Sequence, residues 1–150
     1  MNHADLQIDP ATRTWTGICP ILPGDAGAAY PSENTCRLRP VNLFRCWQLA
    51  DREACALLGG MAKSTWKRWK GGVIDHPERI TDELRRRMAV LMGVHAGLRT
   101  LFDDPERGYA WVRSPNKTIN GKTPLDIMMH GEVCDLIEIR DWLYATCQNW

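Results

Sequence analysis

The sequence contains no long hydrophobic run among its 150 residues. No stretch approaches the roughly 20 consecutive apolar residues that a membrane-spanning helix needs. The N-terminal region also lacks the basic and then apolar order of a secretory signal. We therefore expect a cytoplasmic protein that makes no membrane contact. A chain of this length can bury a sizeable core, in one domain or in two small parts.

Signatures of catalysis and of cofactor binding are missing as well. Neither glycine-rich phosphate motif, G-x-x-x-x-G-K-[ST] or G-x-G-x-x-G, occurs in the sequence. The histidines are scattered, and Ser64 and Ser114 have no histidine nearby in the sequence. His95 lies within an apolar helical stripe, which favours a core or interface residue over a catalytic base. We expect no enzyme activity and no cofactor.

The sequence has no C-x-x-C pair, which excludes a closed zinc site of the usual spacing. Its six cysteines would suit three disulfides in a secreted chain. We favour free thiols, because Cys46 and Cys55 fall in an apolar, helix-patterned stretch where cysteine packs as a small hydrophobe. His130 and Cys134 have the spacing of two metal ligands on one helix face. Without a second pair of ligands, a surface histidine beside a packed cysteine is the simpler interpretation.

Net charge is also small, at +1, but the charges are unevenly distributed. Residues 1–36 carry a net charge of −3, residues 37–100 carry +7 and residues 101–150 carry −3. This asymmetry predicts a basic middle part that can meet an anionic polymer, and a different kind of surface at the C-terminal end.

Every periodic segment has helical spacing, and no segment alternates with a period of two. Residues 1–40 contain five prolines and no sustained period, which predicts an irregular arm. Leu84, Met88, Leu91, His95 and Leu98 form one apolar stripe along a long helix that Thr81 caps. We predict an all-α protein whose helices cover 41–48, 52–58, 63–70, 82–102, 105–113, 124–130 and 132–146.

The third predicted helix is strongly basic and follows a shorter helix and a glycine-containing turn, with Asp51 as the expected cap of that shorter helix. This order is the pattern of a helix-turn-helix. Lysines on one helix face neutralise phosphates, while serine, threonine and arginine reach phosphates or base edges. We therefore predict DNA contacts, although a solvated helix with its tryptophans in a core is the alternative. The predicted DNA-binding residues are Lys63, Ser64, Thr65, Lys67, Arg68 and Lys70.

A polar loop over residues 114–122 separates two later helices and contains the turn dipeptides Pro115-Asn116 and Asn120-Gly121. A loop of this length either carries function or is a plain connector. Near the C-terminus, Trp142 and Trp150 are candidate interface anchors. Core packing is the better interpretation for Trp142, and an interface is the better one for Trp150, because chain termini are rarely buried.

Several motifs, taken in order, resemble one family. They are Ala56-Leu57-Leu58-Gly59, Trp66, Arg68, Trp69, Leu101-Phe102, Trp111, Pro115-Asn116, Gly121, Pro124-Leu125-Asp126, Gly131 and Arg140-Asp141-Trp142-Leu143. Over residues 41–147 the chain resembles the Xre/MbcA/ParS antitoxins, which pair with RES-domain toxins. The resemblance implies a helix-turn-helix part at 41–102 and a helical toxin-binding part at 103–150, after the arm at 1–40.

The resemblance further implies a toxin partner that consumes NAD or ADP-ribosylates, with an active-site cleft that the antitoxin covers. It also implies operator DNA as a second partner and repression of the antitoxin's own operon, with a homodimer or a larger toxin–antitoxin hetero-oligomer as the assembly. The predicted toxin-binding residues are Trp111, Pro115, Asn116, Asn120, Gly121, Pro124, Leu125, Asp126, Met128, Gly131, Arg140, Asn149 and Trp150. The alternative function is a free-standing helix-turn-helix transcriptional regulator whose C-terminal helices serve only for dimerisation.

Overall fold

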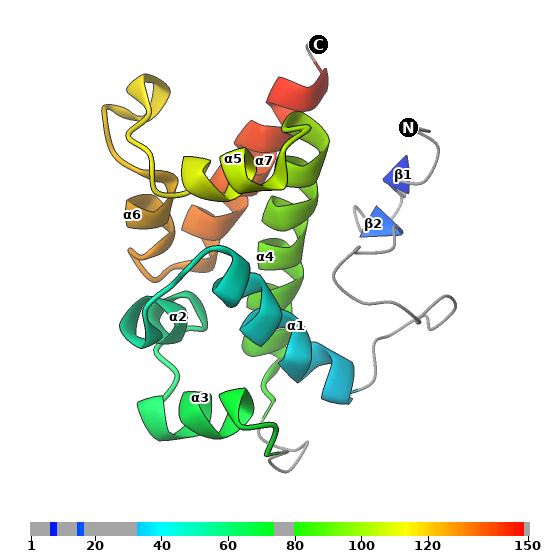
Figure 1. The fold of residues 1–150 in the computed structure, drawn as a ribbon, viewed down its shortest axis with the longest axis vertical. Coiled ribbons are helices and arrows are strands. Elements are labelled where there is room, and N and C mark those ends of the chain that lie inside the picture. The colour runs from blue at the N-terminus through cyan, green and yellow to red at the C-terminus, as the bar shows by residue number, and fades with distance from the viewer. Residues whose placement is uncertain (1–6, 9–14, 17–32, 74–79, 149–150) are drawn as a thin grey trace.

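Two long helices, α4 (Asp82–Leu101) and α7 (Val133–Gln148), pack side by side and form the centre of the molecule (Figure 1). The computed structural model describes residues 7–8, 15–16, 33–73 and 80–148; of 7–8, 15–16 and 33–39 it describes the backbone alone. Within these residues the protein is helical, apart from a two-residue antiparallel pairing of β1 (Gln7–Ile8) with β2 (Trp15–Thr16). The predicted all-α class is confirmed.

The predicted apolar stripe of α4 is the core-facing side of that helix. Met88, Leu91, His95 and Leu98 are each less than a tenth exposed. The Thr81 hydroxyl caps the helix by accepting a hydrogen bond from the backbone N–H of Leu84 at 3.2 Å. On α7, Leu136, Ile139 and Leu143 complete the interface with α4. Apolar spacing predicted both helices, and the structure shows that they pack against each other.

Three helices precede this pair and lie at one end of it: α1 (Glu33–Cys46), α2 (Asp51–Leu57) and α3 (Lys63–Lys70). The first predicted helix is wrong at its start, because α1 begins eight residues before Val41 and includes the last part of the segment predicted as irregular. Pro40 lies inside α1 and is buried. A proline inside a helix removes one backbone hydrogen bond, which is why the sequence pattern placed a boundary there. Packing of Phe44 and Trp47 into the core outweighs this loss.

Three shorter helices complete the C-terminal part: α5 (Pro105–Trp111), the 3-10 turn η3 (Lys117–Ile119) and α6 (Pro124–Met128). Asp104 caps α5 and Thr123 caps α6, each with proline in the next position, as predicted. Helix α5 contacts α4, and α6 contacts α7.

Two arginines hold this C-terminal part in place: Arg113 joins it to the first helices, and Arg87 joins it to the start of α4. The guanidinium of Arg113, just after α5, donates to the carboxylate of Glu53 at 2.6 Å and to the carbonyl of Gln48 at 2.8 Å. Arg87, which is only 4% exposed, donates to Glu83 and to the carbonyl of Gly131. The contacts of Arg113 with Glu53 and Gln48, and of Arg87 with Gly131, connect segments that are 44 to 65 residues apart in the sequence.

Candidate DNA-binding and partner-binding surfaces

Helix α3 buries its tryptophans and exposes most of its polar residues. Trp66 and Trp69 are 3% and 4% exposed, and the Trp66 ring lies 5.7 Å from the ring of Phe44 in α1. Most of the predicted DNA-binding side chains are exposed; they are Lys63, Ser64, Lys67, Arg68 and Lys70, while Thr65 is half-buried. Helix α3 therefore combines an apolar face toward the core with a basic face toward solvent.

Asp51 fixes the orientation of α3. Its Oδ1 accepts hydrogen bonds from the Trp66 indole N–H at 3.0 Å and from the Lys70 ammonium at 2.6 Å. These two bonds, with that of Lys70 the larger cause, hold the pKa of Asp51 below its usual value. The prediction that Asp51 caps α2 is wrong. Ala50 occupies the cap position, and the Glu53 carboxylate accepts the Ala50 backbone N–H instead.

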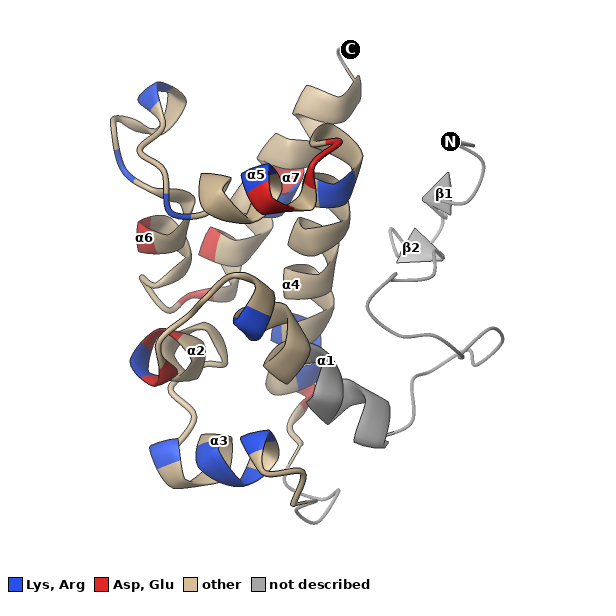
Figure 2. Ribbon diagram, viewed as in Figure 1, with Lys and Arg blue, Asp and Glu red and all other residues tan. Residues whose placement is uncertain are grey.

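Basic residues cluster on α3, whereas basic and acidic residues are mixed in the C-terminal part (Figure 2). Lysine and arginine residues follow one another along α3, and acidic residues occur on α5, α6 and the first part of α7. The basic stretch of the sequence therefore includes one exposed basic helix, α3, while the C-terminal part presents both signs.

Asn116 closes the loop between α5 and α6. Its side-chain oxygen accepts the backbone N–H of Thr118 at 2.9 Å, and its carbonyl accepts that of Gly121 at 2.9 Å. Its own N–H donates to the carbonyl of Lys122. Asn120 and Gly121 have φ values of 58° and 74°, a region that favours these two residue types. The loop is a hydrogen-bonded unit with Pro115, Asn120 and Gly121 exposed.

Helix α6 is anchored by residues that the sequence predicted to bind a toxin. Pro124, Leu125 and Met128 are buried, so their side chains support the loop from the protein interior and are not themselves exposed to a partner. Asp126 is exposed, and its carboxylate accepts the Thr123 backbone N–H at 3.1 Å. Hydrogen bonding by the Thr123 side chain and then by its backbone holds the pKa of Asp126 below its usual value.

Trp111 and Trp142 form a partly exposed aromatic pair. Their rings are stacked with centroids 5.3 Å apart, and the Phe102 ring lies 6.5 Å from that of Trp111. Trp142 thus packs as predicted but keeps part of its ring in solvent. Arg140, on the same helix, pairs with Asp141 and lies over the Tyr144 ring. Asn149 and Trp150 lie outside the described residues.

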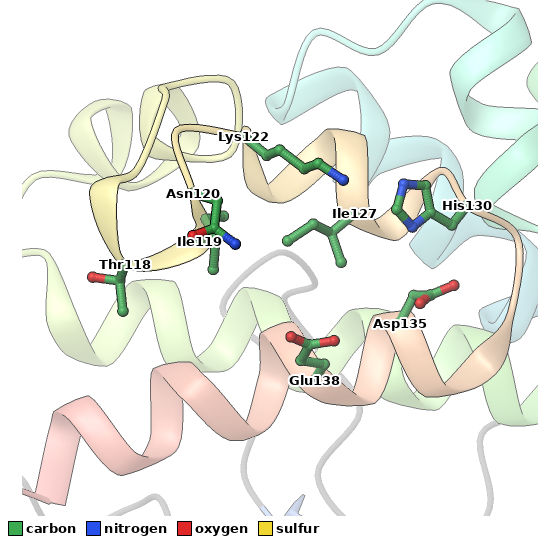
Figure 3. A pocket seen from close by; sticks show the side chains of 8 residues that line it. All are labelled: Thr118, Ile119, Asn120, Lys122, Ile127, His130, Asp135 and Glu138. Atoms are coloured by element: carbon green, nitrogen blue, oxygen red, sulfur yellow. The ribbon is translucent and has the colours of Figure 1, made fainter.

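An open cleft of about 270 Å³ lies between the loop, α6 and α7 (Figure 3). Its lining includes Asp135 and Glu138, which project from α7 toward the loop. The other lining residues are Thr118, Ile119, Asn120, Lys122, Ile127 and His130. Among the described residues, no group of three or more metal-ligating side chains is present, so His130 and Cys134 have no third ligand there. Cys46, Cys55, Cys134 and Cys147 are free thiols, as predicted.

Comparison with known proteins identifies the C-terminal part. Residues 97–146 match the model of the antitoxin Xre/MbcA/ParS C-terminal toxin-binding domain. An uncharacterized protein of Sinorhizobium fredii, y4oB, is 32% identical over 125 residues, which cover 77% of this chain and 90% of that relative. The chain belongs to the Xre/MbcA/ParS antitoxin family. As a family member, it carries a domain that binds a toxin, and this domain comprises the end of α4, the loop and α5 to α7.

The sequence did not point to four residues of this antitoxin-family chain that make long-range contacts or line the cleft in the structure. Arg113 joins the toxin-binding domain to the first helices and Arg87 joins it to the start of α4, and their long-range partners leave no local signal in the sequence. Asp135 and Glu138 line the cleft, and their spacing with Trp142 could have been noticed as one helix edge.

No described helix is long and apolar enough to cross a membrane.

Proposed function

We propose that this chain is the antitoxin of a type II toxin–antitoxin system and neutralises a RES-domain toxin by covering its active site. The observation that carries the proposal is the match of residues 97–146 to a toxin-binding domain. The RES class follows from the resemblance of the motifs between Ala56 and Leu143. The hydrogen-bonded loop, the partly exposed tryptophan pair and the polar cleft supply a surface with the polar and aromatic groups that protein interfaces use.

Complex formation tests this half of the proposal. The chain and the RES-domain protein encoded next to it should elute together in size-exclusion chromatography and bind each other in calorimetry. The gene of a free-standing regulator need not have a RES-domain gene beside it. Absence of binding to that neighbour, with both proteins folded, would favour the regulator.

DNA binding by α3 is the second half of the proposal. The exposed cations of α3 form a basic face, and burial of Trp66 and Trp69 holds that face outward. Lys63 and Lys67 stand one helical turn apart and can contact neighbouring phosphates. Operator binding at this face would allow the chain to repress its own operon.

Replacing Lys67→Ala together with Arg68→Ala tests the DNA half. Removal of one phosphate-binding cation should reduce the steepness of log K against log salt by about 0.9. We therefore expect weaker operator binding with a flatter salt dependence in a fluorescence-anisotropy titration, and unchanged toxin binding. Arg107→Ala, which removes an exposed cation from α5, is the matched control and should leave the titration unchanged. If the double variant binds operator DNA as the wild type does, with the same salt dependence, α3 is not the DNA-binding helix.

A further inference from the structure

One edge of α7 lines the cleft and continues to the tryptophan pair. Asp135, Glu138 and Trp142 follow one another at helical spacings of three and four residues, so they lie along the same side of α7. The two carboxylates line the cleft, and the Trp142 ring stacks on Trp111 farther along the helix. We name the edge formed by Asp135, Glu138 and Trp142 the acidic–aromatic edge.

Within the described residues, the carboxylate of Asp135 accepts a hydrogen bond, whereas that of Glu138 accepts none. Asp135 accepts the backbone N–H of Glu132 at 3.2 Å through Oδ2. Glu138 is exposed and has no hydrogen bond or ion pair within the part of the chain that the structure describes. Its carboxylate can therefore accept two donors from a partner while every internal bond stays in place.

We infer that the acidic–aromatic edge receives an arginine side chain of the toxin. A guanidinium group matches a carboxylate with two parallel N–H donors, and it also lies favourably against the face of a tryptophan ring. Glu138 in the cleft and the partly exposed Trp142, one helical turn farther along α7, together offer both contacts. The net charge of −3 over residues 101–150 favours a cationic group at this end of the molecule.

Lys122 and His130 belong to the opposite wall of the cleft. An anionic occupant would be held by these two side chains instead, so the cleft has two chemically distinct sides. The inference commits to the carboxylate side, because that side continues into the aromatic pair. It rests on the proposed function, since the arginine belongs to the toxin.

Calorimetric titration of the full-length chain into the purified RES-domain protein tests the inference. Glu138→Gln keeps the shape of the side chain and removes its charge, and we expect the dissociation constant to rise about tenfold, mainly through faster dissociation. Asp82→Asn, which removes an exposed charge from the start of α4, is the matched control and should bind as wild type does. Thermal unfolding of each variant shows whether it is folded.

Substitution of the toxin's surface arginines by alanine then identifies the partner group. Against one of these toxin variants, the Glu138→Gln change in this chain should cause no further decrease in affinity, because the same interaction is already absent. Equal affinity of wild type and Glu138→Gln for the toxin would overturn the inference. A loss of affinity in Lys122→Met, with none in Glu138→Gln, would overturn it as well. Failure of the wild-type chain to bind the toxin would contradict the proposed function itself, and that outcome is distinct from the other two.

Discussion

At the scale of single residues, the chain buries a histidine that has no hydrogen-bond partner. His95 is 1% exposed, and neither ring nitrogen has a hydrogen-bond partner in the described part of the chain. The ring stacks on Tyr109 with centroids 5.7 Å apart. Burial, and to a smaller extent the charge of Arg99, lowers the pKa of His95 to about 4. The imidazole is therefore neutral in the folded protein at neutral pH.

This burial predicts a loss of stability in mild acid. In the unfolded chain His95 gains a proton as the pH falls below about 6.5, whereas in the folded protein it does so only near pH 4. The contribution of His95 is therefore fully present above pH 6.5 and decreases through this window, by about 3 kcal/mol in total. Urea unfolding of wild type and His95→Leu between pH 7 and pH 4 should show a weaker pH dependence in the variant. Identical slopes would contradict the assignment of a buried neutral histidine.

The sequence predicted the burial of His95 because its apolar neighbours recur at helical spacing. It did not predict the roles of Asp51 and Lys70. Asp51 carries the signature of a helix cap, but its carboxylate instead binds Trp66 and Lys70 of the next helix. Lys70 was predicted as a DNA contact from its charge and its place on one helix face with Lys63 and Lys67, and the structure shows that its ammonium also pairs with Asp51. Local patterns specify which residues are candidates, and packing between helices decides which partner each one takes.

At the scale of elements, α4 and α7 approach closely because α4 carries glycines at the contact. A Cβ atom added to Gly97 would lie 3.0 Å from the Cβ of Leu143, which is fully buried in α7. The Tyr144 hydroxyl donates to the carbonyl of Gly93 at 3.2 Å across the same contact. The close approach thus brings α7 side chains to the backbone of α4.

We expect Gly97→Ala to destabilise the fold by about 1 kcal/mol. Overpacking costs about 1–3 kcal/mol, and the higher helix propensity of alanine offsets about 1 kcal/mol of it. The cost remains because the Leu143 Cβ is fixed to its backbone and cannot rotate away. Chemical denaturation gives the free energy of unfolding, and Ala89→Gly, at an exposed position of α4, calibrates the effect of helix propensity. A stabilised Gly97→Ala variant would mean that the helices can separate at little cost.

Element prediction succeeded wherever capping residues and apolar spacing agreed. Helix α3 has the bounds expected from the sequence, and α5 and α6 begin at the predicted prolines. It failed at α1, where Pro40 suggested a boundary although tertiary packing continues the helix through it. The cleft could not be predicted, because it depends on how the loop folds over α7.

At the scale of the whole molecule, the small net charge conceals a division of charge between two surfaces. The basic face of α3 and the acidic–aromatic edge of α7 lie in different parts of the chain (Figure 2). Arg87 and Arg113 join these parts through contacts with Gly131, Gln48 and Glu53. We interpret the chain as one unit that presents separate surfaces to DNA and to a toxin.

Neutralisation of the toxin in growing cells tests the central claim most directly. The proposed function predicts a RES-domain gene next to this one. That gene should stop growth when it is induced alone, and growth should resume when this chain is produced with it. Measurement of colony counts and of intracellular NAD under both conditions gives the result. Restored growth is the predicted outcome. Equal killing in the presence and in the absence of the folded chain would contradict the assignment of an antitoxin that acts on a RES-domain toxin.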